Sequence, residues 1–103
     1  YVAAAVSDLP VGVDIERTNR KLAKGLYDRI ACGKEKALYA ALDNTQLLQL
    51  WTAKEAVFKQ TDNNGGLTVS QIDTTAHKVQ TTVTEEFVLS VATDCEEVII
   101  RQM

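Results

Sequence analysis

The most constraining feature of the chain is a run of helix-forming residues from 46 to 60. The run contains neither Gly nor Pro, so it predicts one continuous helix. Lys54 and Glu55 lie within the broad arc of the helical wheel that carries the large apolar side chains, Leu47, Leu50, Trp51, Val57 and Phe58. Because an unpaired buried charge is costly, these two side chains either join an internal ion pair or face a site that binds a metal ion or an anion.

The residues before this helix predict a hairpin and two shorter helices. Residues 1–6 are apolar, and residues 11–16 alternate apolar and polar side chains, so we expect two strands joined by a turn. Thr18 and Asn19 provide an N-cap for a helix that reaches Ile30. Residues 34–42 predict a second helix, and residues 43–45 provide the cap of the central helix.

After Gly65 and Gly66, which end the central helix, the hydrophobic period changes to two. We expect further strands at residues 67–72, 78–84, 87–91 and 98–100. Helices that follow one hairpin and precede several strands indicate an α+β fold, with an antiparallel sheet packed against helices. We expect residues 1–103 to form a single domain.

Composition excludes several classes of function. The chain has 103 residues and a net charge of −3, which argues against a nucleic-acid partner. Its apolar runs are shorter than the roughly 20 residues that span a membrane. With no signal peptide in view, we expect a cytoplasmic protein whose Cys32 and Cys95 are free thiols. The single histidine, His77, falls in a predicted turn, where we expect an exposed side chain without a catalytic role.

Two carboxylates project from one face of the predicted strand at residues 11–16. Asp14 and Glu16 alternate with apolar residues, which places their side chains about 7 Å apart on the same side. Carboxylates this close repel each other unless a cation lies between them, and oxygen ligands of this kind suit Mg²⁺. Gly12 on the same face leaves space for a ligand to approach the backbone. The alternative is a solvated strand edge without a bound ion.

The chain resembles the 4′-phosphopantetheinyl transferases in two segments. Residues 11–16, VGVDIE, are similar to the first signature motif of that superfamily, and residues 51–59, WTAKEAVFK, are similar to the second. Between them, Arg29 and Glu35 resemble the family's arginine-to-glutamate spacing, with Ile30 in place of the expected aromatic residue. The resemblance is closest to the C-terminal half of the two-half, surfactin-synthetase-activating class, which is related to holo-acyl-carrier-protein synthase.

The resemblance implies Mg²⁺-dependent transfer of the 4′-phosphopantetheine arm of coenzyme A to a serine of an acyl or peptidyl carrier protein. It implies that Asp14, Glu16 and Glu55 bind the metal. It also implies catalytic roles for Glu55, which would help to deprotonate the serine, and for Lys54. Lys54 and Lys59 are the implied coenzyme A ligands. Phosphoryl transfer needs charge neutralisation at the diphosphate, which agrees with this set of residues.

The resemblance further implies that the chain is one half of a pseudo-dimer. In the two-half class, the other half binds the adenosine and 3′-phosphate of coenzyme A. We therefore expect either a fragment of a longer protein or a homodimer or trimer with the coenzyme A cleft between subunits. In such an assembly, Arg17, Arg20 or Lys21 of a neighbour would replace the missing basic residues.

Two other functions are compatible with the same residues. One is a non-catalytic module that binds a carrier protein or coenzyme A. The other is a structural half-domain in which Asp14, Glu16, Lys54 and Glu55 form an internal ion-pair network. Such a network should be indifferent to Mg²⁺, whereas a site of three carboxylates should be stabilised by it.

Overall fold

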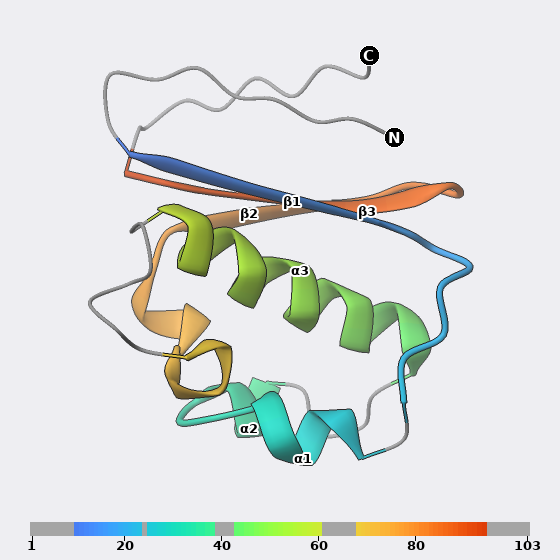
Figure 1. Cartoon of the computed structure of the whole chain (residues 1–103), viewed down its shortest axis with the longest axis horizontal. Helices are drawn as coiled ribbons and strands as arrows, with labels where there is room; N and C mark the ends of the chain where they lie inside the picture. Colours follow the sequence, from blue (N-terminus) through green and yellow to red (C-terminus); the bar gives the residue numbers. More distant parts are fainter. Residues whose placement is uncertain (1–9, 24, 39–42, 61–67, 95–103) are drawn as a thin grey trace.

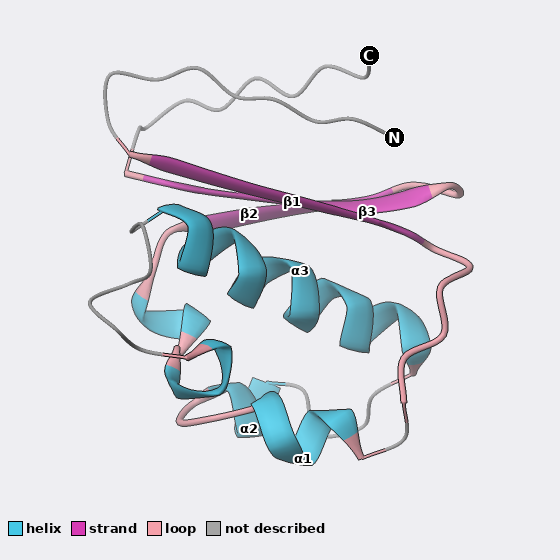
Figure 2. Cartoon of the chain, in the orientation of Figure 1, coloured by secondary structure: helices cyan, strands magenta, loops and turns pink. Residues whose placement is uncertain are grey.

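The computed structural model describes residues 10–23, 25–38, 43–60 and 68–94. Within these residues the chain forms three layers (Figure 1): an antiparallel sheet, the long helix α3 (Asn44–Gln60) across one face of it, and a layer of short helices beyond α3. Figure 2 shows the strands on one side of α3 and the short helices on the other. This arrangement confirms the expected α+β fold. Of the described helices, none is long and apolar enough to cross a membrane.

The sheet joins segments that are far apart in the sequence. Strands β1 (Val11–Arg17) and β2 (Val79–Val83) both pair antiparallel with β3 (Phe87–Thr93), which is the central strand. All three confirm predicted strands. Every residue of β3 is buried, because it has a neighbouring strand at each edge and side chains packed on each face. The register places Asp14 directly opposite Ser90.

The two faces of the sheet differ as the alternation in β1 predicts, but α3 covers the face that carries Gly12 and Asp14. The opposite face carries an apolar cluster of Phe87, Leu89 and Val91 with Val11, Val13 and Ile15. A side chain at Gly12 would overlap the carbonyl oxygen of Ala56. Gly12 therefore leaves space for the backbone of α3, and the prediction that it leaves space for a ligand is wrong.

Helix α3 confirms the predicted central helix and its cap. Asp43 Oδ1 accepts a hydrogen bond from Gln46 N at 2.8 Å, and Gln46 Oε1 accepts one from Asp43 N at 3.0 Å, which is a capping box. Because α3 lies between two layers, it is buried on two sides, and its buried residues are Leu48, Leu50, Thr52, Ala53, Lys54, Ala56 and Val57. Three residues of the predicted buried arc, Leu47, Trp51 and Phe58, are only partly buried.

The helix predicted from residue 18 to residue 30 is wrong in its first half. The helix in this segment is α1 (Leu26–Ile30), and Gly25 immediately before it adopts the left-handed φ of 84°. The backbone further upstream is bound by the side chain of Asn44 instead. Asn44 Oδ1 accepts from Leu22 N at 3.1 Å, and Asn44 Nδ2 donates to the carbonyl oxygen of Arg20 at 2.8 Å.

The strand predicted at residues 67–72 is also wrong, because its described residues form the 3₁₀ turn Val69–Gln71. Gln71 Oε1 accepts from Thr68 N at 2.9 Å, so a local side-chain bond takes the place of strand pairing. A second 3₁₀ turn, Thr74–Ala76, follows, and His77 after it is exposed as expected.

The remaining predictions of secondary structure are tested only in part. Helix α2 (Glu35–Leu38) lies within the helix predicted at residues 34–42. The strands predicted at residues 1–6 and 98–100, and the end of the central helix at Gly65 and Gly66, lie outside the described residues.

Candidate functional site

Asp14 lies within a group of charged side chains between β1 and α3. Its side chain is 11% exposed, and Oδ1 accepts a hydrogen bond from Lys59 Nζ at 2.9 Å. The half-exposed Lys59 also donates to the carbonyl oxygen of Val13 at 3.3 Å. The other carboxylate oxygen, Asp14 Oδ2, is buried and has no hydrogen-bond partner among the described residues. A buried polar atom without a partner is unfavourable, so a cation or a proton at Oδ2 would be stabilising.

Glu55 belongs to the same electrostatic group. It lies one helical turn before Lys59 on α3, the spacing at which side chains are neighbours. Partial burial raises the pKa of Glu55, the negative charges of Asp14 and Glu16 raise it further, and Lys59 opposes the shift. Burial also raises the pKa of Asp14, in spite of its hydrogen bond to Lys59. The charge of Glu16 therefore acts on both Asp14 and Glu55, and the charge of Asp14 acts on Glu55.

Glu16, the third carboxylate, is paired with Arg20. Glu16 Oε1 accepts a hydrogen bond from Arg20 Nη1. The side chain of Arg20 is 46% exposed and that of Glu16 is 21% exposed, so water screens this ion pair. Arg20, which we expected to serve a neighbouring subunit, is thus paired within its own chain. The positive charge of Arg20 also counteracts the rise in the pKa values of Asp14 and Glu55.

Asp14, Glu16 and Glu55 have the donor atoms that a metal ion needs, but the structure does not gather all three side chains around one point. In the described part of the chain, no group of three or more His, Cys, Asp and Glu side chains is gathered closely enough to hold a metal ion. The ligand set Asp14, Glu16 and Glu55 therefore stays a prediction. Its donors are carboxylate oxygens, which Mg²⁺ prefers, and the buried Asp14 Oδ2 has no other partner in the segments that the structure describes.

Lys54 does not belong to this group, and its expected roles in catalysis and coenzyme A binding need correction. Its side chain is 0% exposed, and Nζ donates to Glu35 Oε1 at 2.7 Å. Nζ also donates to the carbonyl oxygen of Ile72 and lies 3.8 Å from Cys32 Sγ. Its ammonium group cannot reach a phosphate without breaking these contacts. Successive helical residues point about 100° apart, so Lys54 and Glu55 face different layers around α3.

Glu35 satisfies both of its carboxylate oxygens in the core. Besides Lys54, Oε1 accepts from Cys32 N at 3.0 Å, while Oε2 accepts from Thr74 N at 2.9 Å and from Thr74 Oγ1 at 2.7 Å. The internal ion pair of Lys54 is therefore with Glu35, and not with Glu55. Sequence analysis missed this pairing. The one signal in the sequence was the arginine-to-glutamate spacing of Arg29 and Glu35, which resembles that of the family and marks Glu35 as a residue with a specific role.

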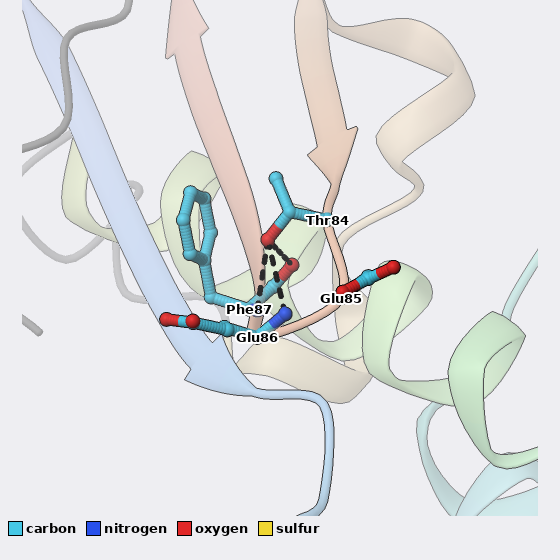
Figure 3. A pocket seen from close by; sticks show the side chains of 4 residues that line it. All are labelled: Thr84, Glu85, Glu86 and Phe87. Atoms are coloured by element: carbon cyan, nitrogen blue, oxygen red, sulfur yellow. Dashed lines mark hydrogen bonds between the residues drawn. The ribbon is translucent and has the colours of Figure 1, made fainter.

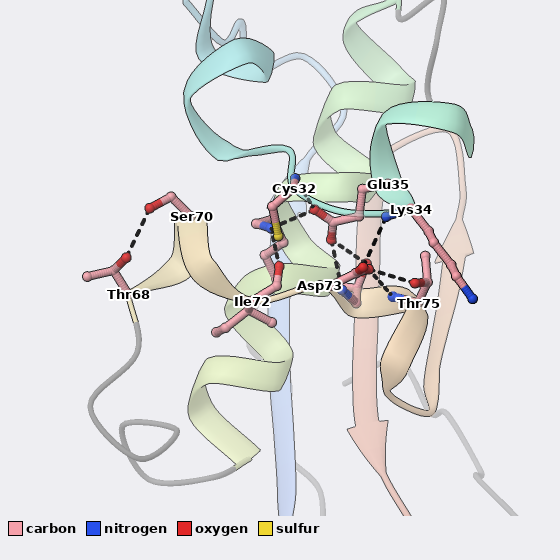
Figure 4. Close-up of polar contacts among 10 residues, drawn as sticks. Cys32, Lys34, Glu35, Thr68, Ser70, Ile72, Asp73 and Thr75 are labelled. Atoms are coloured by element: carbon pink, nitrogen blue, oxygen red, sulfur yellow. Dashed lines mark hydrogen bonds and ion pairs between the residues drawn. The ribbon is translucent and has the colours of Figure 1, made fainter.

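A second carboxylate, that of Asp73, connects the same two loops (Figure 4). Asp73 Oδ2 accepts from Lys34 N at 3.0 Å, and Oδ1 accepts from Thr75 Oγ1 at 2.6 Å and from Thr75 N at 3.0 Å. The side-chain hydrogen bond from Thr75 is the main cause that lowers the pKa of Asp73. Cys32, beside this network, is a partly buried free thiol, as expected, and burial raises its pKa. These contacts are structural.

An open pocket of about 280 Å³ lies at the turn between β2 and β3 (Figure 3). It is lined by Thr84, Glu85, Glu86 and Phe87. The hydroxyl of Thr84 accepts hydrogen bonds from the backbone N–H groups of Glu86 and Phe87 at 3.2 and 3.1 Å. The Thr84 hydroxyl thus helps to close the turn, and none of the predicted site residues lines the pocket.

Comparison with known proteins agrees with the two motifs. A family model described as the 4′-phosphopantetheinyl transferase superfamily matches residues 10–98, a segment that contains Asp14, Glu35 and Glu55. The chain belongs to the 4′-phosphopantetheinyl transferase superfamily. No curated protein and no solved structure matched it. Membership supports phosphopantetheine transfer as the general activity, with coenzyme A and a carrier protein as the partners that this superfamily uses. It also agrees with an α+β half-domain in which the described residues form a three-stranded sheet.

Proposed function

We propose that this chain carries out Mg²⁺-dependent transfer of the 4′-phosphopantetheine arm of coenzyme A to a serine of an acyl or peptidyl carrier protein. The observation that carries the proposal is the buried Oδ2 of Asp14, which has no partner among residues 10–23, 25–38, 43–60 and 68–94. It lies in a group where three carboxylates face two cations, Lys59 and Arg20. A group with more negative than positive charge and an uncommitted oxygen favours a bound cation.

Asp14, Glu16 and Glu55 would hold the metal ion. When bound, Mg²⁺ neutralises charge on the diphosphate and orients it for attack. Lys59 is half exposed at the end of α3, where its ammonium can reach a phosphate oxygen in solvent. Lys54 has no part in this proposal, because its partners in the core are Glu35 and the backbone of Ile72.

Glu55 is the proposed proton acceptor. Its raised pKa makes it a stronger base than an ordinary Glu, which suits proton removal near neutral pH. In the reaction, the serine oxygen forms a bond to the phosphorus that carries pantetheine. The P–O bond of the coenzyme A diphosphate breaks, and its electron pair stays on the departing phosphate. The serine proton passes to Glu55, directly or through a water molecule.

The test is mass spectrometry of an apo carrier protein incubated with the full chain, coenzyme A and Mg²⁺. We expect the carrier to gain one phosphopantetheine group, and we expect Asp14→Asn and Glu55→Gln to lose about 100-fold or more in rate, as loss of general-base or electrostatic catalysis does. Asp28→Asn is the matched control, because it removes an exposed carboxylate on α1. Transfer that continues without Mg²⁺, or in Asp14→Asn, would contradict the proposal.

A binding module without activity is the second candidate. It is favoured by the lack of a three-ligand group gathered for a metal among the described residues. Such a module would bind coenzyme A or a carrier protein in calorimetry, yet leave the mass of the carrier unchanged at every Mg²⁺ concentration.

We also propose that the chain works as one half of the two-half arrangement, in the cytoplasm, and is completed by a second copy or by a preceding half. The domain is small, and homo-oligomers close most often by two-fold symmetry. Sedimentation equilibrium with and without coenzyme A tests this. A monomer that nevertheless transfers phosphopantetheine would contradict it.

A further inference from the structure

Lys59 is the cation that contacts Asp14, and its charge also acts on Glu55. Its ammonium bonds Asp14 Oδ1 at 2.9 Å, and its positive charge opposes the shifts in the pKa values of both Asp14 and Glu55. Both partners of Lys59 lie in β1, whereas its side chain is 50% exposed and comes from the last turn of α3. The ammonium can therefore leave Asp14 for water without disturbing a buried layer.

We propose that Lys59 is an exchangeable counterion of Asp14, displaced by the divalent metal ion and thereby released to bind the diphosphate of coenzyme A. The inference rests on the proposed function and specifies the order in which its ligands bind. Metal binding comes first, because it frees the ammonium group that the second ligand needs.

The exchange follows from the charges at Asp14. An ammonium and a divalent ion at one carboxylate repel each other, so the weaker partner moves away. An ion pair whose lysine is half exposed is weak, so a divalent ion coordinated by carboxylate oxygens can displace it. A flexible Lys side chain loses little when it turns toward water.

Lys54 provides the contrast, because its ammonium group cannot move into water. Its ammonium is fully buried and has three partners from segments outside α3, so no ligand can reach it. Arg20 is the other cation of the site, but its hydrogen bond is to Glu16 and not to the carboxylate with the buried oxygen. Lys59 is thus the described cation whose release would uncover Asp14.

The test is isothermal titration calorimetry on the full chain, with MgCl₂ alone and then with coenzyme A at saturating Mg²⁺. Lys59→Gln should bind Mg²⁺ up to about fivefold more tightly than the unaltered chain, a change that corresponds to about 1 kcal/mol. The same variant should bind coenzyme A about tenfold more weakly, because a charge-assisted hydrogen bond is lost. Lys36→Gln, which removes an exposed lysine on α2, should change neither affinity.

The opposite signs of the two effects distinguish exchange from general damage. Lys59→Met keeps the apolar stem and should behave like Lys59→Gln, and circular dichroism checks that both fold. Equal or weaker Mg²⁺ binding by both variants would overturn the exchange and leave the proposed function standing. Absence of Mg²⁺ binding in every variant, or binding that survives Asp14→Asn, would contradict the proposed metal site itself and the exchange with it.

Discussion

Two lysines on α3 mark the difference between the core of this protein and its candidate site. Lys54 is fully buried, and its carboxylate partner, Glu35, has a donor for each oxygen. Lys59 is half exposed, and its partner, Asp14, keeps one buried oxygen that has no donor within the described part of the chain. A satisfied buried pair fixes the arrangement of the loops around it, whereas an unsatisfied pair is available to a ligand. A charged helical residue whose ion-pair partner has all its hydrogen bonds made is therefore structural, whereas one whose partner lacks a hydrogen bond is a candidate for ligand binding.

The largest expected effect comes from breaking the buried pair on the Glu35 side. Glu35→Ala would leave the Lys54 ammonium without its counterion and the backbone N–H groups of Cys32 and Thr74 without an acceptor. We expect the free energy of unfolding to fall by about 3 to 5 kcal/mol, the usual result of orphaning a buried charge. Urea unfolding measures it. Asp14→Asn is the comparison and should change stability by less than about 1 kcal/mol. Equal losses in the two variants would remove the distinction between the pairs.

Gly12→Ala should affect the site more selectively. The new methyl group would overlap the backbone of Ala56 and Gln60, so β1 must move away from α3. We expect a loss of about 1 to 3 kcal/mol, typical of overpacking, and a weaker affinity for Mg²⁺ because Asp14 moves with its strand. Urea unfolding and calorimetry measure these changes. Ala76→Val is the control, because it adds methyl groups at an exposed position. An unchanged Mg²⁺ affinity in Gly12→Ala would show that the spacing of β1 and α3 does not position Asp14.

The pH dependence of stability should show a smaller effect that differs in sign between the two regions. The pKa values of Asp14 and Glu55 are raised above the ordinary 3.8 and 4.5, so the folded state binds more protons than the unfolded state between the ordinary and the raised values. The free energy of unfolding therefore falls as the pH rises through that window. The pKa of Asp73 is lowered, so its contribution is lost as the pH falls through values below 3.8.

Urea unfolding of the unaltered chain and of Asp14→Asn across this pH range tests the assignment. Asp14→Asn should flatten the decline, and saturating Mg²⁺ should do the same in the unaltered chain. If the free energy of unfolding depends on pH in the same way in Asp14→Asn and in the unaltered chain, the pKa of Asp14 is not raised by burial.

The smallest effect is expected at Arg20. Its ion pair with Glu16 is exposed, so Arg20→Gln should change the free energy of unfolding by at most about 1 kcal/mol. Because its charge counteracts the rise in the pKa of Glu55, the same variant should shift the pH profile of carrier modification to higher pH. A stability loss as large as that of Glu35→Ala would contradict the view that the exposed pairs are weak.

Much of the fold was predictable because it depends on local patterns. The alternation in β1 and the capping box of Asp43 and Gln46 are readable from short segments. The predictions failed where distant side chains replace local preference. Asn44 binds the backbone near Leu22, which the pattern assigned to a helix.

The charged residues around Asp14 were predictable as a group from the sequence, but Lys54 was wrongly included with them and their geometry was not predictable. The alternation places Asp14 and Glu16 on one face, and the motif resemblance adds Glu55 and Lys59. A helical wheel shows the buried side of α3 as one arc. It could therefore not reveal that Lys54 faces the layer of short helices, where Glu35 lies. Assigning Lys54 and Glu55 to different layers requires the structure, which shows that α3 is covered on two sides.

The central position of β3 has a consequence for the order in which the protein assembles during synthesis. β1 leaves the ribosome before β3, which is its strand partner among the described residues and lies about 70 residues further along the chain. Contacts between residues so distant in sequence form late, because a long loop must close first. Helix α3 can form while translation continues, yet β1, which carries Asp14, gains its partner only when β3 emerges. A nascent chain stalled before residue 87 would therefore contain both signature motifs and still lack the site.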